Sequence, residues 1–285
     1  MVKLKTLIII FLLMFVSKGI CQESAALTDG FDQIDGFSGR KIVATGLVGG
    51  LLIGSLVDAY YAWWKDASTP FAFRAEGWFS SRRGIDKAGH FFTSYFYFHT
   101  FRNVMLWGGY EASTALWWAA GTAGFFAVSV EIGDGVTDYA FDYQDLLFNL
   151  GGIGYGILQT RIPFLKNFNF KWSFVPEHGY RFPPRFTNDY DAHIYWLTAD
   201  MNELLPQSWE PYWPDFLQLA IGYGVDDNVT KSELAVGFDI NLEVFGTTNE
   251  HLLLAEKTLN MFHIPAPGVK FTDSKKPRYS LFLKN

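Results

Sequence analysis

The chain has 285 residues and a formal net charge of −6, without a run of basic residues, which argues against nucleic acid as a partner. Aromatic residues make up 18% of the chain, and charged residues make up another 18%. Charged residues usually account for about a quarter of a soluble domain, so this balance favours contact with a membrane.

The first 21 residues have the pattern of a secretory signal peptide. Two lysines precede an apolar run, Leu7 to Val16, that is too short to cross a bilayer with ease. Cleavage just before Gln22 fits this pattern, and lipidation of Cys21 is the alternative. Because Cys21 is the only cysteine, the mature chain is expected to have no disulfide and no thiol nucleophile. We therefore expect an exported, periplasmic, membrane-associated protein, with the outer membrane as one candidate.

Residues 41–160 have the periodicity of apolar helices and are expected to form one helical domain. The first helix, Ile42 to Trp64, has a single charge at Asp58 and is long enough to cross a membrane. Its last five positions hold four aromatic residues, as in an interfacial aromatic belt. Glycines on one face recur every four residues and would let another helix approach closely in lipid. They are Gly46, Gly50 and Gly54.

Three further helices are predicted in this domain. They run from Asp86 to Trp107, from Ala112 to Val130, and from Asp145 for about 15 residues. The last would measure roughly 22 Å, which is short of a hydrocarbon core of about 30 Å. The four helices are therefore either partly embedded in a membrane or a tight bundle associated with one.

Residues 161–285 change to a period of two and are expected to be rich in β-strands. The runs Leu217 to Val225 and Leu234 to Val244, joined by a polar turn, predict an antiparallel hairpin. Other strands are expected at 168–174, at His193 to Thr198 and in "RYSLFLKN".

Four or five strands of this kind are too few to close a barrel. We expect a small antiparallel sheet with one face against the helices or a membrane. A connecting loop is expected at "PEHGYRFPPRF", and an amphipathic helix capped by Asn249 is expected to end before Pro265. The predicted fold class is therefore α+β, with an apolar four-helix group followed by a β-rich region.

Three ionisable residues open the second predicted helix. Asp86 and His90 are four residues apart and share a helix face, with Lys87 beside them. Asp86 is also placed where a helix N-cap or first-turn acid belongs, which is a sufficient explanation for it alone. For His90 alone, a core histidine bonded to a carboxylate is the simpler interpretation.

A second group of polar residues lies further along the same domain. Glu131 and Asp134 end the third helix, and Asp145 and Asn149 share a face of the fourth. Helix-end charge or an interhelical hydrogen bond explains each one singly. Acids buried among apolar helices must be neutralised, paired or hydrated, so we predict that all of them join Lys87 in one network.

Three motifs in this domain resemble the YfiM-like family of predicted periplasmic proteins and lipoproteins, whose function is unknown. They are "DKAGHFFTSY", "VEIGDG" and "FDYQDLLFNLGGIGYG", within a match that covers roughly Ile42 to Gln159. The chain is also similar, more distantly, to VanZ-like membrane proteins, which share the Asp-Lys-x-x-His opening and an Asp-x-x-x-Asn helix. The resemblance identifies the polar set without assigning it a role.

Three functions are compatible with this sequence: a structural or binding protein, an enzyme, and a small-molecule or metal sensor that would use His90 with Glu131, Asp134 or Asp145. The first is a structural or binding protein of the bacterial envelope. Its network or binding residues would be Lys87, Asp134, Asp145 and Asn149. Its partner would be a membrane lipid or another envelope component, and the sequence does not identify a protein partner. No cofactor is expected.

The second possible function is that of an enzyme acting on lipid or cell-wall headgroups. His90 would be the acid or base, with Asp86 or Glu131 as its orienting partner. A metal site of His90 with carboxylates would suit manganese or magnesium better than zinc, but we expect no metal. The arrangement of His90, Glu131 and Asp145 distinguishes the enzyme from the structural protein. Convergence of the three side chains on an open cavity favours an enzyme, and a sealed, mutually bonded network favours a structural protein.

Overall fold

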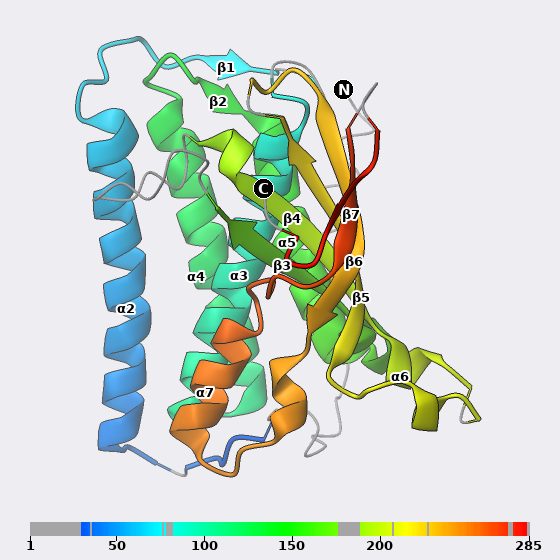
Figure 1. The fold of residues 1–285 in the computed structure, drawn as a ribbon. Helices are drawn as coiled ribbons and strands as arrows, with labels where there is room; N and C mark the ends of the chain where they lie inside the picture. Colours follow the sequence, from blue (N-terminus) through cyan, green and yellow to red (C-terminus); the bar gives the residue numbers. More distant parts are fainter. Residues whose placement is uncertain are drawn as a thin grey trace, which may run out of the picture.

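The computed structural model describes residues 30–34, 36–75, 77, 82–175, 189–206, 208–226, 228–272 and 276–283. The predicted signal peptide at 1–21 and the predicted loop at 176–186 lie outside these residues. The fold is α+β, as predicted: a group of apolar helices is followed by an antiparallel sheet (Figure 1).

Four long helices form the first half of the described chain. They are α2 (Gly39–Ala59, extended by a π-helical turn at Tyr60–Trp64), α3 (Ile85–Trp107), α4 (Ala112–Asp134) and α5 (Tyr143–Arg161). The last is longer than the predicted 15 residues, because Asp142 starts it early by accepting a hydrogen bond from the Gln144 amide at 2.8 Å. Asp86 lies in the first turn of α3, as predicted.

The helices pack around large aromatic side chains of α3. Phe98 and Phe101 are fully buried against alanines of α4 and Ile153 of α5. Small residues bring α3 and α5 together, because a side-chain carbon at Gly152 would collide with the Phe91 backbone, and one at Gly156 would collide with the Phe98 ring.

Helix α2 stands at one side of this group (Figure 1). Its glycines face open space, so the close helix approach predicted at Gly46, Gly50 and Gly54 does not occur within the described chain. In the described residues, α2 with its π-helical turn and α4 are each long and apolar enough to cross a membrane. Only 17% of the most apolar stretch of α2 is buried, against 44% for α4.

The second half forms a six-stranded sheet in the order β3-β4-β5-β6-β7-β8, with all neighbours antiparallel. The strands are β3 (Phe168–Phe174), β4 (His193–Asp200), β5 (Leu217–Val225), β6 (Ser232–Ile240), β7 (Gly268–Thr272) and β8 (Arg278–Ser280).

Two predictions about the sheet were wrong. The sheet has six strands rather than four or five, because the short strand β7 was missed. Strand β6 ends at Ile240 rather than Val244, since the side chain of Asn241 caps a single 3-10 turn at Leu242–Phe245. The β5–β6 hairpin is confirmed.

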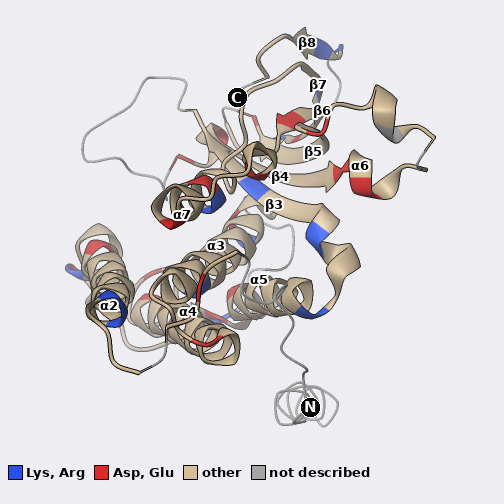
Figure 2. Ribbon diagram, turned by 90° about the horizontal axis from the view of Figure 1, so that it is seen from below, with Lys and Arg blue, Asp and Glu red and all other residues tan. Residues whose placement is uncertain are grey.

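Smaller elements complete the fold. Helix α7 (Glu250–Leu259) starts where Asn249 accepts hydrogen bonds from the amides of His251 and Leu252, as predicted. The others are β1 (Phe73–Arg74), which pairs in parallel with β2 (Phe141–Asp142), and the single turn α6 (Met201–Leu204). Viewed along the helices, α2 to α5 form one layer, and the sheet lies beyond α3 with β3 and β4 nearest to it (Figure 2).

Candidate functional site

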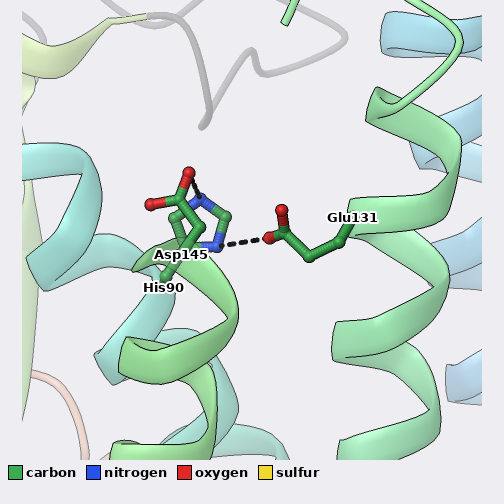
Figure 3. A group of neighbouring side chains, drawn as sticks. All are labelled: His90, Glu131 and Asp145. Atoms are coloured by element: carbon green, nitrogen blue, oxygen red, sulfur yellow. Dashed lines mark ion pairs between the residues drawn. The ribbon is translucent and has the colours of Figure 1, made fainter. Parts of the chain in front are cut away.

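The predicted polar residues meet where three helix ends come together. The start of α3 supplies Asp86, Lys87 and His90, the end of α4 supplies Glu131, and the start of α5 supplies Asp145. Figure 3 shows His90, Glu131 and Asp145 of this set. Nearly 60 residues of sequence separate the first and last of these side chains. The fold joins them because α3 and α5 pack tightly through the small residues of α5.

Lys87 binds carboxylates from two helices. Its buried ammonium lies 2.5 Å from Asp145 Oδ1, 3.1 Å from Asp142 Oδ2 and 3.4 Å from Asp86 Oδ2. Burial alone would lower the pKa of Lys87, but the hydrogen bond and charge of Asp145, with those of the other two acids, raise it above its ordinary value. Lys87 therefore stays charged and ties the start of α3 to the start of α5.

His90 lies between the two carboxyl groups of Glu131 and Asp145 (Figure 3). Its Nδ1 is 3.7 Å from Glu131 Oε1, and its Nε2 is 3.6 Å from Asp145 Oδ2. The amide nitrogen of Asn149 is 3.3 Å from Nδ1. The His90 side chain is 25% exposed, so the imidazole is the part of this group most open to its surroundings.

Glu131 is the most deeply buried acid of the group, with 1% of the residue exposed. Its Oε2 accepts a hydrogen bond from the Asp142 amide at 3.3 Å, and its Oε1 accepts one from Asn149 at 3.4 Å. Burial, reinforced by the charges of Asp145 and Asp134, raises the pKa of Glu131 to about 9. Glu131 therefore holds a proton at neutral pH.

Asn149 connects all three helices. Its Oδ1 accepts a hydrogen bond from Ser94 of α3 at 2.8 Å, while its amide nitrogen reaches Glu131 of α4 and His90 of α3. Ser94 and Asn149 are both buried, so this chain of hydrogen bonds is sealed from solvent. It satisfies polar groups that would otherwise be costly inside the bundle.

Asp134 has a different partner from the one predicted. Its Oδ1 accepts a hydrogen bond from Trp64 Nε1 at 2.7 Å, which ties the end of α4 to the turn that follows α2. Burial raises the pKa of Asp134, and the nearby charges of His90 and Asp145 also act on it. Asp86, proposed as an orienting partner of His90, instead pairs with Lys87.

Three members of the network were not predicted from the sequence. Asp142 was recognised only as a position near the start of the last helix, although an acid at a helix N-cap between two other acids is a signal for a buried cation partner. Trp64 was predicted to belong to the aromatic belt at the end of the first helix, and Ser94 was expected only to lie within a helix. Their polar atoms carry no sequence signal, since only the packing of the helices brings Asn149 and Asp134 within reach.

Acidic groups predominate in this cluster. Five carboxyl groups face Lys87 and His90, and the guanidinium of Arg82 adds a positive charge near Asp134. They belong to Asp86, Glu131, Asp134, Asp142 and Asp145. The chemistry available here is hydrogen bonding, retention of a proton by Glu131 and proton exchange through His90.

His90, Glu131 and Asp145 each offer a ligand atom within 4.8 Å of the others, and such hard donors suit a divalent cation. However, the two acids face opposite nitrogens of the His90 ring, and one ion can bind only one nitrogen. Asp145 is also paired with Lys87, whose ammonium competes with a cation. The arrangement therefore favours hydrogen bonding over metal binding.

Residues 75–161 match the family model described as predicted periplasmic lipoprotein (DUF2279). This segment is a DUF2279 domain. The match confirms the family resemblance, over a segment that begins later than the predicted Ile42 and contains α3, α4 and α5 with the whole His90 cluster. The description of the family agrees with the predicted export, and the protein is an exported periplasmic protein associated with a membrane. No curated protein and no solved structure matches the chain.

Proposed function

We propose that this protein is a membrane-associated structural or binding protein of the bacterial envelope, in which the polar network of the DUF2279 domain fixes how α3, α4 and α5 pack. The observation that carries this proposal is the position of Lys87, whose buried ammonium lies within 3.4 Å of three carboxylates from the starts of α3 and α5. A buried cation with three anionic partners specifies one arrangement of the helices around it.

A second observation supports the same proposal. Glu131, Asn149 and Ser94 form a continuous chain of hydrogen bonds across the three helices, and all three residues are buried. Groups that are sealed and bonded to one another have no access to a substrate. The network therefore stabilises a surface on which His90 is the exposed member, and a membrane lipid or another envelope component is the partner.

Amide hydrogen exchange on the full-length protein in detergent tests this function. Lys87→Met should reduce protection at the starts of both α3 and α5, because one ammonium joins them. His90→Gln should leave protection in both segments unchanged, because its contacts are 3.3 Å or longer. Loss of protection confined to the start of α3 in Lys87→Met would contradict a network that joins the helices.

The exposure of His90 favours one alternative, an enzyme that acts on lipid or cell-wall headgroups. The imidazole faces a protonated acid, Glu131, on one side and Asp145 on the other, which is an arrangement suited to proton transfer. His90→Gln keeps hydrogen bonding but removes acid–base capacity.

Envelope lipids and cell-wall fragments of a deletion strain, complemented with the wild type or with His90→Gln, distinguish the two functions. Complementation by both proteins at equal abundance supports the structural or binding protein. Failure of His90→Gln alone, at normal protein level, supports the enzyme.

A further inference from the structure

The polarity of the C-terminal sheet is inverted relative to a sheet in water. Its polar and small side chains point to one face, and that face is buried. A cross-strand row on this face runs from Lys171 through Trp196, Gly222 and Ala235 to Lys270. Lys171 and Trp196 are completely or almost completely buried, and Lys270 is buried as well.

Ion pairs neutralise the charges on this buried face. Lys171 Nζ lies 2.5 Å from Asp239 Oδ2, and the other oxygen of Asp239 is 3.0 Å from His263 Nδ1. Lys270 Nζ lies 2.9 Å from Glu233 Oε2. Such residues are seldom buried in a soluble domain unless they are paired, so the inward orientation of this face is specific.

The opposite face of the sheet is apolar. The row next to the buried one runs Leu197, Ile221, Val236 and Val269 across four strands. Ile221 is 53% exposed, and its neighbours are also open. The exposed apolar residues of this face, from here on the open sheet face, are Leu197, Leu219, Ile221, Leu234, Val236 and Phe271.

Among the described residues, α3 covers one side of the apolar face. Phe170 of β3 packs edge-to-face on Phe91 of α3 with ring centroids 4.6 Å apart, and Phe92 contacts both Trp172 and Tyr195. Helix α3 also reaches β5, where the Tyr223 hydroxyl donates a hydrogen bond to the carbonyl of Arg83 just before the helix. Figure 2 shows β5 to β7 lying progressively farther from α3.

Aromatic side chains extend the open sheet face at one end. Trp213, in the loop before β5, lies 6.3 Å from Phe238 of β6 between ring centroids. The same loop exposes Trp209 and Tyr212, the latter to 86%. Amphipathic aromatic rings of this kind are enriched where a protein meets the headgroup level of a membrane.

We propose that the open sheet face lies against the acyl chains of a lipid membrane, with the loop of Trp209 and Tyr212 at the headgroup level. This inference rests on the proposed membrane association and names its contact surface. A sheet in water would bury its apolar face and expose its charged face. Here the exposed side chains are aliphatic or aromatic, and the charged side chains are inside.

Lipid fits this surface better than a protein partner does. The paired positions of β5 and β6 on this face, from Leu217↔Ile240 to Val225↔Ser232, hold no charged side chain, whereas protein interfaces that form and dissociate combine an apolar centre with a polar rim. Alternation of apolar outward and polar inward residues is also the pattern of strands that face lipid.

Nitroxide labels on single-cysteine variants test the inference. Ile221→Cys and Leu234→Cys place a label on the open sheet face, and Asn228→Cys places the control in the exposed polar turn of the same hairpin. The full-length protein is reconstituted in vesicles of phosphatidylethanolamine and phosphatidylglycerol. Relaxation by oxygen, which concentrates in lipid, is compared with relaxation by a water-soluble nickel chelate, and the unmutated chain reports labelling at Cys21.

We expect the oxygen-to-nickel ratio to be several-fold higher at Ile221 and Leu234 than at Asn228. An equally low ratio at all three positions, in protein that floats with the vesicles, would overturn this inference and leave membrane association intact. Dipolar broadening between labels of two molecules would also overturn it, because a second copy would then cover the face. Protein that does not float with the vesicles would refute the proposed membrane association as well.

Discussion

Two of the buried ionisable clusters in the described chain, one around Lys171 and one around His90, differ in charge balance and in access to solvent. In the sheet cluster, the side chains of Lys171, Asp239 and His263 are at most 1% exposed, and Asp239 contacts both of the others. Burial alone would raise the pKa of Asp239, but its hydrogen bond with His263 and the charge of Lys171 hold it below its usual value. This cluster is sealed and charge-balanced.

The cluster around His90 has an excess of acid and a partly exposed imidazole. Its pKa shifts run in the opposite direction, because burial and neighbouring acids raise the pKa of Glu131 to about 9 and also raise that of Asp145. The sheet cluster is therefore closed to solvent, whereas the helical cluster has an excess of acid and an imidazole that is open to its surroundings.

The largest effect is expected from Lys171→Met, which leaves Asp239 buried without its ammonium. Removing one partner of a sealed pair costs about 4 kcal/mol of unfolding free energy. Denaturant unfolding in detergent measures this loss, and the double variant Lys171→Met/Asp239→Leu should recover most of it. A loss of less than about 1 kcal/mol in the single variant would show that the sheet cluster is not structural.

Lys87→Met should cost about 3 kcal/mol, since Asp145 and its two neighbouring acids lose their common cation. The same unfolding measurement checks it. Lys65→Met is the matched control, because Lys65 makes only an exposed pair with Asp66 at 4.0 Å, so its replacement should have little effect. Equal effects of the two substitutions would contradict the role assigned to Lys87.

Glu131→Gln should change how stability depends on pH. Glu131 retains its proton up to a pKa of about 9 in the folded chain, while a free glutamate releases it near 4.5. The folded state therefore binds more protons between these values, and the wild type loses stability as pH rises through that window. Glutamine cannot ionise, so the variant should lose about 2 kcal/mol less than the wild type between pH 6 and pH 7.5.

Parallel unfolding curves at pH 6 and pH 7.5 check this prediction. A pH dependence that is identical in both proteins would mean that Glu131 is ionised in the folded state. The buried acid of the helical cluster would then be ionised in the folded protein, like Asp239 of the sheet cluster.

His90→Gln should have the smallest effect, less than about 0.5 kcal/mol, because the imidazole is partly exposed and its contacts are long. Thermal unfolding measures it. A loss comparable to that of Lys87→Met would place His90 in the structural part of the network and remove the distinction drawn for its exposed ring.

The sequence predicted the helices and the members of the helical cluster well, because the ionisable residues stand out in apolar helices and their spacing places them on shared faces. Asp86, Lys87, His90, Glu131, Asp145 and Asn149 do converge. The sheet cluster was not predicted. Lys171 and Asp239 alternate with apolar residues, as solvent-facing residues do, and only the segment around His263 that covers them makes that face internal. Alternation identifies two faces but not which of them is buried.

The structural role proposed for the helical cluster requires that the buried ammonium of Lys87 couples α3 to α5. A double-mutant cycle with Lys87→Met, Asp145→Asn and the combined variant measures this coupling in unfolding free energy. The 2.5 Å contact between Lys87 Nζ and Asp145 Oδ1 predicts a coupling of about 1–3 kcal/mol. Losses that simply add would contradict a network that holds the two helices together.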